Sequence, residues 1–173
     1  MYISKRTAVA LLTASAFGGS AATAVTALGD EGSHGTGHRQ EGNGVLLKTP
    51  LAPSVPTDPT LLGAVAGGVP WVLRSGEAKV RSDGRFTVRI RGLLIPSGPG
   101  AGTTGPVKTV SASLYCDAST TPVGTSNSVP LRSDGDARIS TTLSLPTKCL
   151  IPAVLIHPNG MLNAYITTSG FGG

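Results

Sequence analysis

The sequence feature that most constrains the fold is a strict alternation of apolar and polar residues. It is clearest in the run 85–91, which reads Arg-Phe-Thr-Val-Arg-Ile-Arg. Successive side chains of a β-strand point to opposite faces, so a period of two predicts a half-buried strand. The apolar side chains of this run are expected to face a core, and its arginines to face solvent.

A second alternating run, 77–81, precedes the first and is separated from it by Ser82-Asp83-Gly84. A short loop that ends in glycine between two such runs indicates a β-hairpin. The side chains predicted to point inward are Ala78, Val80, Phe86, Val88 and Ile90.

The tetrapeptide Arg81–Gly84 is repeated as Arg132–Gly135, and a further alternating run, 137–145, follows the second copy. This run predicts a second hairpin arm. An internal duplication would explain the repeat, but a single tetrapeptide is weak support for one. We therefore attribute the repeat to convergent turn chemistry.

Shorter apolar or alternating runs follow at 109–116, 153–156 and 162–166, and no window has the period of an amphipathic helix. About eight short strands separated by regularly spaced turns are typical of a β-sandwich or barrel. We predict an all-β, immunoglobulin-like β-sandwich over residues 61–173.

Residues 1–27 have the layout of a secretory signal peptide. Lys5 and Arg6 precede the apolar run 8–17. Ala22-Thr23-Ala24 fits a small-residue cleavage site, and Val25-Thr26-Ala27 fits one nearly as well. An apolar run of roughly ten residues is shorter than the about 20 that a membrane-spanning helix needs. We expect a secreted protein, extracellular or associated with the cell wall, with no membrane span.

Residues 28–60 differ in composition from the rest of the chain. Glycines come first, and a proline series follows at Pro50, Pro53, Pro56 and Pro59. So few apolar residues are not expected to offset the entropy of ordering, and the segment is predicted to be a disordered Gly/Pro-rich arm. Its one apolar island is 45–47, for which we favour docking on the domain over exposure in a tail.

The chain has 2 cysteines, Cys116 and Cys149. In an oxidising compartment such a pair indicates a disulfide rather than a metal or redox site, and C-x-x-C spacing is absent. Cys116 shares the inward parity of its predicted strand, so the bridge is expected in the core. Closing a loop of about 34 residues is worth on the order of 3–4 kcal/mol by the chain-entropy model.

Removal of Lys5 and Arg6 with the signal peptide leaves 12 of 14 basic residues against 9 acidic ones, so the formal net charge falls from +5 to +3. Without a clustered patch, this excess is too small to indicate nucleic-acid binding.

The basic residues that do cluster are on the outer face of the first predicted hairpin. They are Lys79, Arg81, Arg85, Arg89 and Arg91. Like charges on neighbouring strands cost stability, so their clustering makes this a candidate binding face for an acidic partner: an anionic cell-wall polymer, an acidic polysaccharide or an acidic protein. From the sequence alone we favour the other interpretation, a solvated face that also discourages edge aggregation. Interleaved aromatic residues are absent, which argues against single-stranded nucleic acid.

Residues suited to catalysis are sparse. His157, the one histidine of the domain, precedes a turn proline, and no G-x-S-x-G elbow is present. Asp83 and Asp134 are explained as turn residues. We expect no catalytic site; the alternatives are a dispersed enzyme site near His157, Asp117 or Glu77, and a small-ligand carrier with an apolar cleft between the sheets.

Metal and sugar sites have weak support. His34 and His38 stand four apart in the Gly-rich arm, where a polar linker is favoured over a weak copper or zinc site. Trp71, the single tryptophan, is expected to fill a core edge rather than to serve as a sugar platform. We predict no metal and no cofactor.

Five segments carry a resemblance to known proteins: 69–72, 85–94, 110–116, 135–139 and 149–155. Together they resemble a group of small, secreted, two-cysteine β-domain proteins of actinobacteria (high-GC Gram-positive bacteria) that have no assigned activity. The resemblance covers about residues 61–168. It implies export, a two-cysteine pattern and an all-β domain, and transfers no catalytic or ligand residue. A fainter likeness is to the secreted enediyne-binding apoproteins, whose two bridges this chain does not match.

Together these features predict a secreted, non-enzymatic binding or structural domain of the cell envelope. The Arg-rich hairpin face is its candidate contact surface.

Overall fold

The computed structural model describes residues 44–169, all of which belong to the unit His38–Gly173. This part of the chain contains strands and no helix, as predicted. The expected signal peptide, and residues 28–43 of the expected arm, lie outside the described residues. The strands are β1 (Val45–Pro53), β2 (Val65–Ala66), β3 (Ser75–Arg81), β4 (Arg85–Arg91), β5 (Thr109–Tyr115), β6 (Gly124–Thr125), β7 (Val129–Pro130), β8 (Ala137–Thr142), β9 (Ala153–Pro158), β10 (Ala164–Tyr165) and β11 (Thr167–Ser169).

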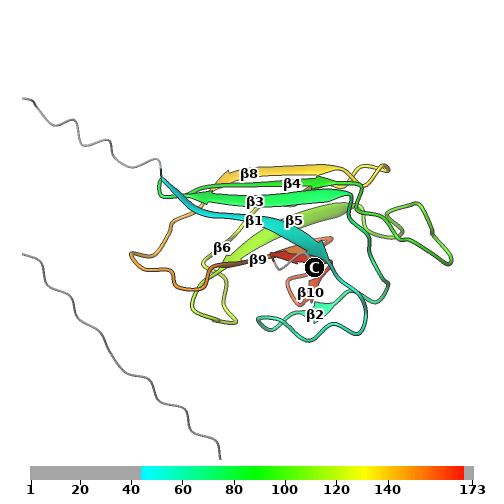
Figure 1. Cartoon of the computed structure of the whole chain (residues 1–173), viewed down its shortest axis with the longest axis horizontal. Coiled ribbons are helices and arrows are strands. Elements are labelled where there is room, and N and C mark those ends of the chain that lie inside the picture. Colours follow the sequence, from blue (N-terminus) through cyan, green and yellow to red (C-terminus); the bar gives the residue numbers. More distant parts are fainter. Residues whose placement is uncertain (1–43, 170–173) are drawn as a thin grey trace, which may run out of the picture. The chain divides into compact units, whose positions relative to one another are not determined.

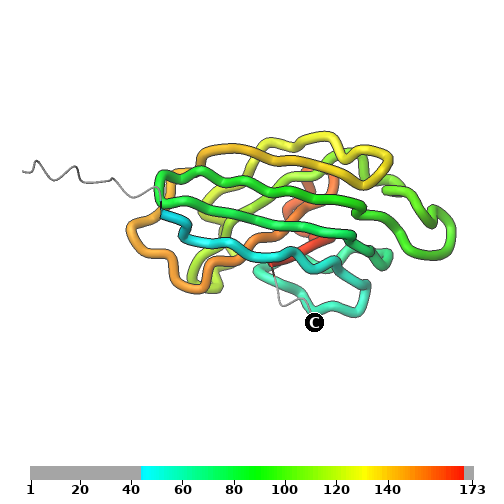
Figure 2. Tube along the Cα trace, turned by 45° about the horizontal axis from the view of Figure 1, so that its top comes forward, coloured from blue at the N-terminus to red at the C-terminus, as the bar shows by residue number. Residues whose placement is uncertain are grey.

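Nine of these strands form one sheet that curls over on itself (Figures 1 and 2). Its order is β6-β5-β9-β11-β1-β3-β4-β8, and β7 also pairs with β5. Strand β1 joins the two halves, because its residues 45–50 pair with β3 and its residues 51–53 pair with β11. One layer therefore contains β1, β3, β4 and β8, and the other contains β5, β6, β7, β9 and β11.

The immunoglobulin-like strand order is not confirmed. In an immunoglobulin constant domain one sheet has the order A-B-E-D, so the second strand pairs with the fifth. Here β3 forms a hairpin with β4, the next strand in the sequence, and both stay in one layer. The predicted pairing of 77–81 with 85–91 is confirmed by this hairpin.

The main core lies between the two layers. The five side chains predicted to point inward from the first hairpin are all buried in it, as is Trp71. From the opposite layer, Val110, Ala112 and Leu114 of β5 pack into the same cluster together with Val154 and Ile156 of β9. The period of two therefore identified the inner faces correctly.

Strands β5 and β9 are buried on both faces, which agrees with the continuously apolar run 153–156. On their far side, Tyr115 and Leu155 pack with Ala64 and Tyr165 in a second apolar cluster. The short parallel pair β2–β10 contributes to this cover (Figure 1). Ser111 and Ser113 are buried for the same reason, although both are polar.

The predicted disorder of the arm is wrong for residues 45–53, and the ordered domain begins before residue 61. This segment is β1, and Val45 and Leu47 are in register with Arg81 and Val80 of β3. The favoured docking of 45–47 is thus confirmed. The arm's composition was misleading because β1 has a strand on each side, and backbone pairing offsets the entropy that its few apolar side chains could not.

The repeated tetrapeptide forms the same turn twice, which supports convergent turn chemistry. Gly84 donates to the carbonyl of Arg81 and Gly135 to that of Arg132, each at 2.9 Å. Each turn aspartate also accepts from the backbone N–H two residues on: Asp83 Oδ1 from Arg85 at 3.0 Å, and Asp134 Oδ1 from Asp136 at 3.1 Å.

The second turn does not close a hairpin, so the predicted second hairpin arm is wrong. Before the turn, β7 pairs with β5 in one layer, and after it β8 pairs with β4 in the other. A turn motif sets local geometry only, whereas the partner of the next strand is decided by long-range packing.

The disulfide between Cys116 and Cys149 is present, with a Cα–Cα distance of 5.0 Å. Cys116 is buried at the end of β5, as predicted. Next to the bridge, Asp117 donates its N–H to the carbonyl of Leu150 at 2.7 Å, and its Oδ1 accepts from Leu150 N–H at 2.8 Å. The bridge therefore lies within a doubly hydrogen-bonded connection between two loops.

We expect Cys149→Ser to destabilise the domain by about 3–4 kcal/mol, because the unfolded chain regains the entropy of the closed loop. Thermal unfolding followed by circular dichroism measures the effect, and a reductant should lower the melting temperature of the parent protein to a similar degree. An unchanged melting curve, or two free thiols in the oxidised protein, would contradict this expectation.

Gly135→Ala should also destabilise the domain, by at least about 2 kcal/mol, since an alanine there meets both backbone strain and overlap. Gly135 has a φ of +78°, and a Cβ at this position would overlap the backbone of Leu93. Gly98→Ala is the matched control, because its φ is +75° and nothing lies within 4 Å of a Cβ built there. Equal midpoints for the two variants in urea unfolding would show that the close approach at Gly135 is not important.

Candidate functional site

The hairpin β3–β4 displays the predicted basic residues on the outer surface of its layer. Phe86, Val88 and Ile90 are buried in the core, so the alternate residues of β4 must face away from it. Arg85, Arg89 and Arg91 are exposed, and Lys79 and Arg81 on β3 are half-buried. The five predicted residues thus share one outer surface.

Strand β8 adds Arg138 to this surface. Arg89 lies directly opposite Glu77 on β3 and directly opposite Arg138 on β8. Sequence reasoning assigned Arg138 to the polar side of the run 137–145 but to a different hairpin, so it was not grouped with the others. We call the set Lys79, Arg81, Arg85, Arg89, Arg91 and Arg138 the basic face.

Two carboxylates near the basic face form ion pairs with basic side chains. Glu77 pairs with Lys48 at 3.4 Å, and Asp83 pairs with Arg85 at 3.5 Å. Within residues 44–169, Arg89, Arg91 and Arg138 form no ion pair. Their guanidinium groups therefore keep a full set of donors for an external acceptor.

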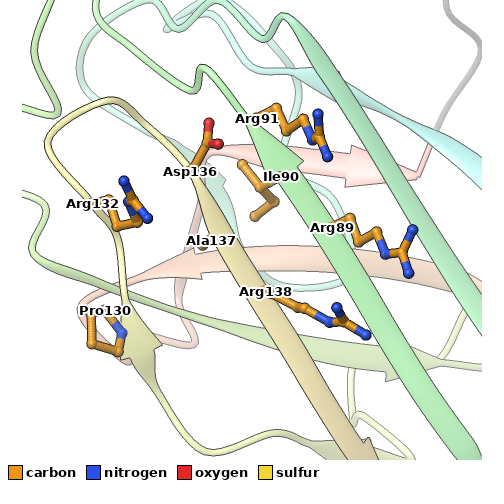
Figure 3. A pocket seen from close by; sticks show the side chains of 8 residues that line it. All are labelled: Arg89, Ile90, Arg91, Pro130, Arg132, Asp136, Ala137 and Arg138. Carbon is orange, nitrogen blue, oxygen red and sulfur yellow. The ribbon is translucent and has the colours of Figure 1, made fainter.

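A hollow of about 510 Å³ opens where β4, the start of β8 and the preceding turn meet (Figure 3). Four arginines line it: Arg89 and Arg91 from β4, Arg138 from β8, and Arg132 from the turn. Among the described residues that line it, the one carboxylate belongs to Asp136, whose Oδ1 accepts from Gly92 N–H at 2.9 Å. The other lining residues are Ile90, Pro130 and Ala137, so no aromatic ring is available for stacking.

This arrangement suits the binding of anions. Arginine presents planar, permanently charged donor groups that match carboxylate and phosphate oxygens. Arg132 is partly neutralised by Asp134 at 3.1 Å, which leaves the stronger excess of charge on the β4–β8 side. The hollow is open to solvent rather than enclosed, and Figure 3 shows the side chains that line it.

The three residues considered for a dispersed enzyme site do not come together. Glu77 pairs with Lys48, and Asp117 binds the backbone of Leu150. His157 is fully buried in β9, with its Nδ1 2.7 Å from the carbonyl of Ala164. No hydrogen bond joins any two of these three in the described part of the chain.

An apolar pocket lies beside the disulfide, where a small-ligand carrier would need its cleft. Its volume is about 170 Å³, and Leu46, Leu114 and Leu145 are among its lining residues. Sites for small ligands usually have about 300–1,000 Å³. The pocket is too small to favour a carrier.

Among residues 44–169, no three His, Cys, Asp or Glu side chains are grouped so that they could hold a metal ion. The pair His34 and His38 lies outside the described residues. None of the elements in the described range is a helix long and apolar enough to cross a membrane.

Comparison with known proteins adds no relative: no family model, curated protein or solved structure matches this chain. The resemblance to actinobacterial secreted proteins therefore stays an expectation.

The structure predicts a loss of stability in mild acid through His157. Desolvation lowers the pKa of His157 below 6.5, and the hydrogen bond to Ala164 opposes this only in part. A carbonyl only accepts, so Nδ1 carries the proton, and protonation would place a second N–H, on Nε2, where no described residue accepts it.

The folded state should therefore take up this proton less readily than the unfolded state. The contribution of neutral His157 to the free energy of unfolding is complete above pH 6.5. It is lost as the pH falls from there toward the lowered pKa of His157. Urea unfolding between about pH 7.5 and 5, where carboxylates stay ionised, should show falling stability. The variant His34→Gln/His38→Gln should show the same pH dependence of stability as the parent protein. A flat profile for this variant would show that His157 does not cause the dependence.

Proposed function

We propose that this chain is a secreted, non-enzymatic binding domain of the cell envelope that holds an acidic polymer on its basic face. The observation that carries the proposal is the placement of Arg89, Arg91 and Arg138 on two adjacent strands, none of them in an ion pair with a described residue.

Stability alone does not account for these charges. Arg89 and Arg138 are directly opposite each other, and like charges in this position destabilise a strand pair. Protection against edge aggregation would need charges on the edge strand β8, where only Arg138 of the three arginines lies. However, Arg89 and Arg91 lie on β4, which has a strand on each side. A face that binds an anion explains their positions better.

The open shape of the surface favours an extended ligand over a small one. The hollow at the start of β8 continues along the sheet as a second one of about 230 Å³, and Arg89 and Arg138 line both. A polymer with repeated carboxylates or phosphates can contact the row at several points, which raises its affinity through multivalency. The lack of aromatic rings in both hollows disfavours single-stranded nucleic acid.

Export is supported by two independent features. Residues 1–27 have the layout of a signal peptide, and the disulfide is of the kind that persists in oxidising compartments. An envelope location would also bring the basic face next to anionic polymers, which are abundant there in Gram-positive bacteria, the group suggested by the sequence resemblance.

The test is adsorption to isolated bacterial cell walls. We expect the parent protein to bind at low salt and to be released at high salt, and Arg89→Glu/Arg91→Glu to bind at least about tenfold more weakly, because two attractive contacts become repulsive.

The matched control is Lys108→Glu/Lys148→Glu, which changes the net charge equally at exposed positions outside the basic face. This variant should retain most of the adsorption. Equal losses in the two variants would indicate a nonspecific effect of net charge and would contradict a defined binding face.

A further inference from the structure

Strand β8 is the last strand of the sheet at the side of the basic face. It pairs with β4 on one side, and no strand within residues 44–169 pairs with it on the other. Its pairing with β4 covers six residues without a register shift, and the strand contains no proline. A straight, regular edge strand of this kind is a template on which another strand can pair.

The register shows which backbone groups face the free edge. Leu143 donates its N–H to the carbonyl of Gly84 at 2.9 Å, so this pair is hydrogen-bonded. Hydrogen-bonded and non-hydrogen-bonded pairs alternate along antiparallel strands. Thr141, Ile139 and Ala137 therefore bond to β4, whereas Arg138, Ser140 and Thr142 direct their N–H and C=O groups outward.

The edge has a defined start. Arg132 donates its N–H to the outward carbonyl of Asp136 at 3.0 Å, so the turn occupies the position just before Arg138. Beyond it, the side chains of Arg138, Ser140 and Thr142 are all exposed. The free part of the edge thus begins beside the arginine-lined hollow.

We propose that an extended acidic polypeptide adds to β8 as a further antiparallel strand. This inference rests on the proposed function and names the chemical class of its partner. The added strand would bond through its backbone to Arg138, Ser140 and Thr142. Paired residues share a face of the sheet, so its carboxylates would lie on every second residue, next to Arg138 and within reach of the arginines of the hollow.

A second copy of this chain is a poorer occupant of the same edge. Antiparallel pairing of β8 with β8 of another molecule puts equivalent faces on the same side of the joined sheet. The two basic faces would then be adjacent, and their like charges would repel. An acidic strand would instead compensate Arg89, Arg91 and Arg138, which form no ion pair with a described residue.

The alternation of side chains makes the proposed strand addition testable. The probe is a synthetic peptide of about eight residues that alternates glutamate with threonine. If glutamates face the basic face, the amides of the glutamates are the ones that point at β8. N-methylation of the glutamate amides should weaken binding to the full chain at least about tenfold, whereas N-methylation of the threonine amides should change it little.

Ser140→Pro provides the matching change in the protein. Proline removes the outward N–H of residue 140 and leaves the hydrogen bonds of Thr141 and Ile139 to β4 intact, which is why edge strands tolerate it. We expect at least about tenfold weaker peptide binding for this variant and near-parental binding for Ser140→Ala. Circular dichroism checks that both variants fold. If Ser140→Pro does not fold, binding of the two N-methylated peptides to the parent protein still tests the inference.

The outcomes separate this inference from the proposed function. Equal binding of the two N-methylated peptides, or parental affinity of a folded Ser140→Pro variant, would overturn strand addition. Salt-sensitive adsorption to cell walls that persists in such a case would leave the proposed function in place. Formation of dimers in sedimentation, blocked by Ser140→Pro, would instead assign the edge to a second copy and would also overturn the inference.

Discussion

The burial of one face of β4 is the constraint on which both the core and the candidate site depend. Phe86, Val88 and Ile90 fill the space between the layers, and burying three large side chains is worth roughly 5–9 kcal/mol before conformational entropy is counted. Since side chains alternate along a strand, the same burial directs Arg85, Arg89 and Arg91 outward. Stability and the display of charge are two consequences of a single backbone conformation.

Two structural features stabilise a domain that is poor in aromatic residues. Strand β1 pairs with β3 at its start and with β11 at its end, so the two layers belong to one continuous sheet. At the end of β5, the disulfide and the paired hydrogen bonds of Asp117 and Leu150 tie the 116 and 149 loops together. Strand β1 and the disulfide both connect segments that are far apart in the sequence, while the alternating strands supply the interior.

Much of the fold was predictable from local pattern, and the errors share one cause. The hairpin, its buried side chains, the disulfide and the buried position of Trp71 follow from parity, turn residues and cysteine count. Local pattern does not indicate that residues 45–53 form strand β1, that β8 pairs with β4, or that Ser111 and Ser113 are buried. These depend on which segments meet over long distances, and neither composition nor period contains that information.

The sequence by itself determined that the described part of the chain is all-β, which side chains of the β3–β4 hairpin are buried, and that its arginines lie on an outer surface, because a period of two acts within each strand. Tertiary structure alone decided that Arg138 joins Arg89, that Arg132 completes the hollow, and that β8 ends the sheet. The physical reason is that strand partners are chosen by non-local packing between layers. A residue's face is therefore a local property, whereas its neighbours across strands are a property of the whole fold.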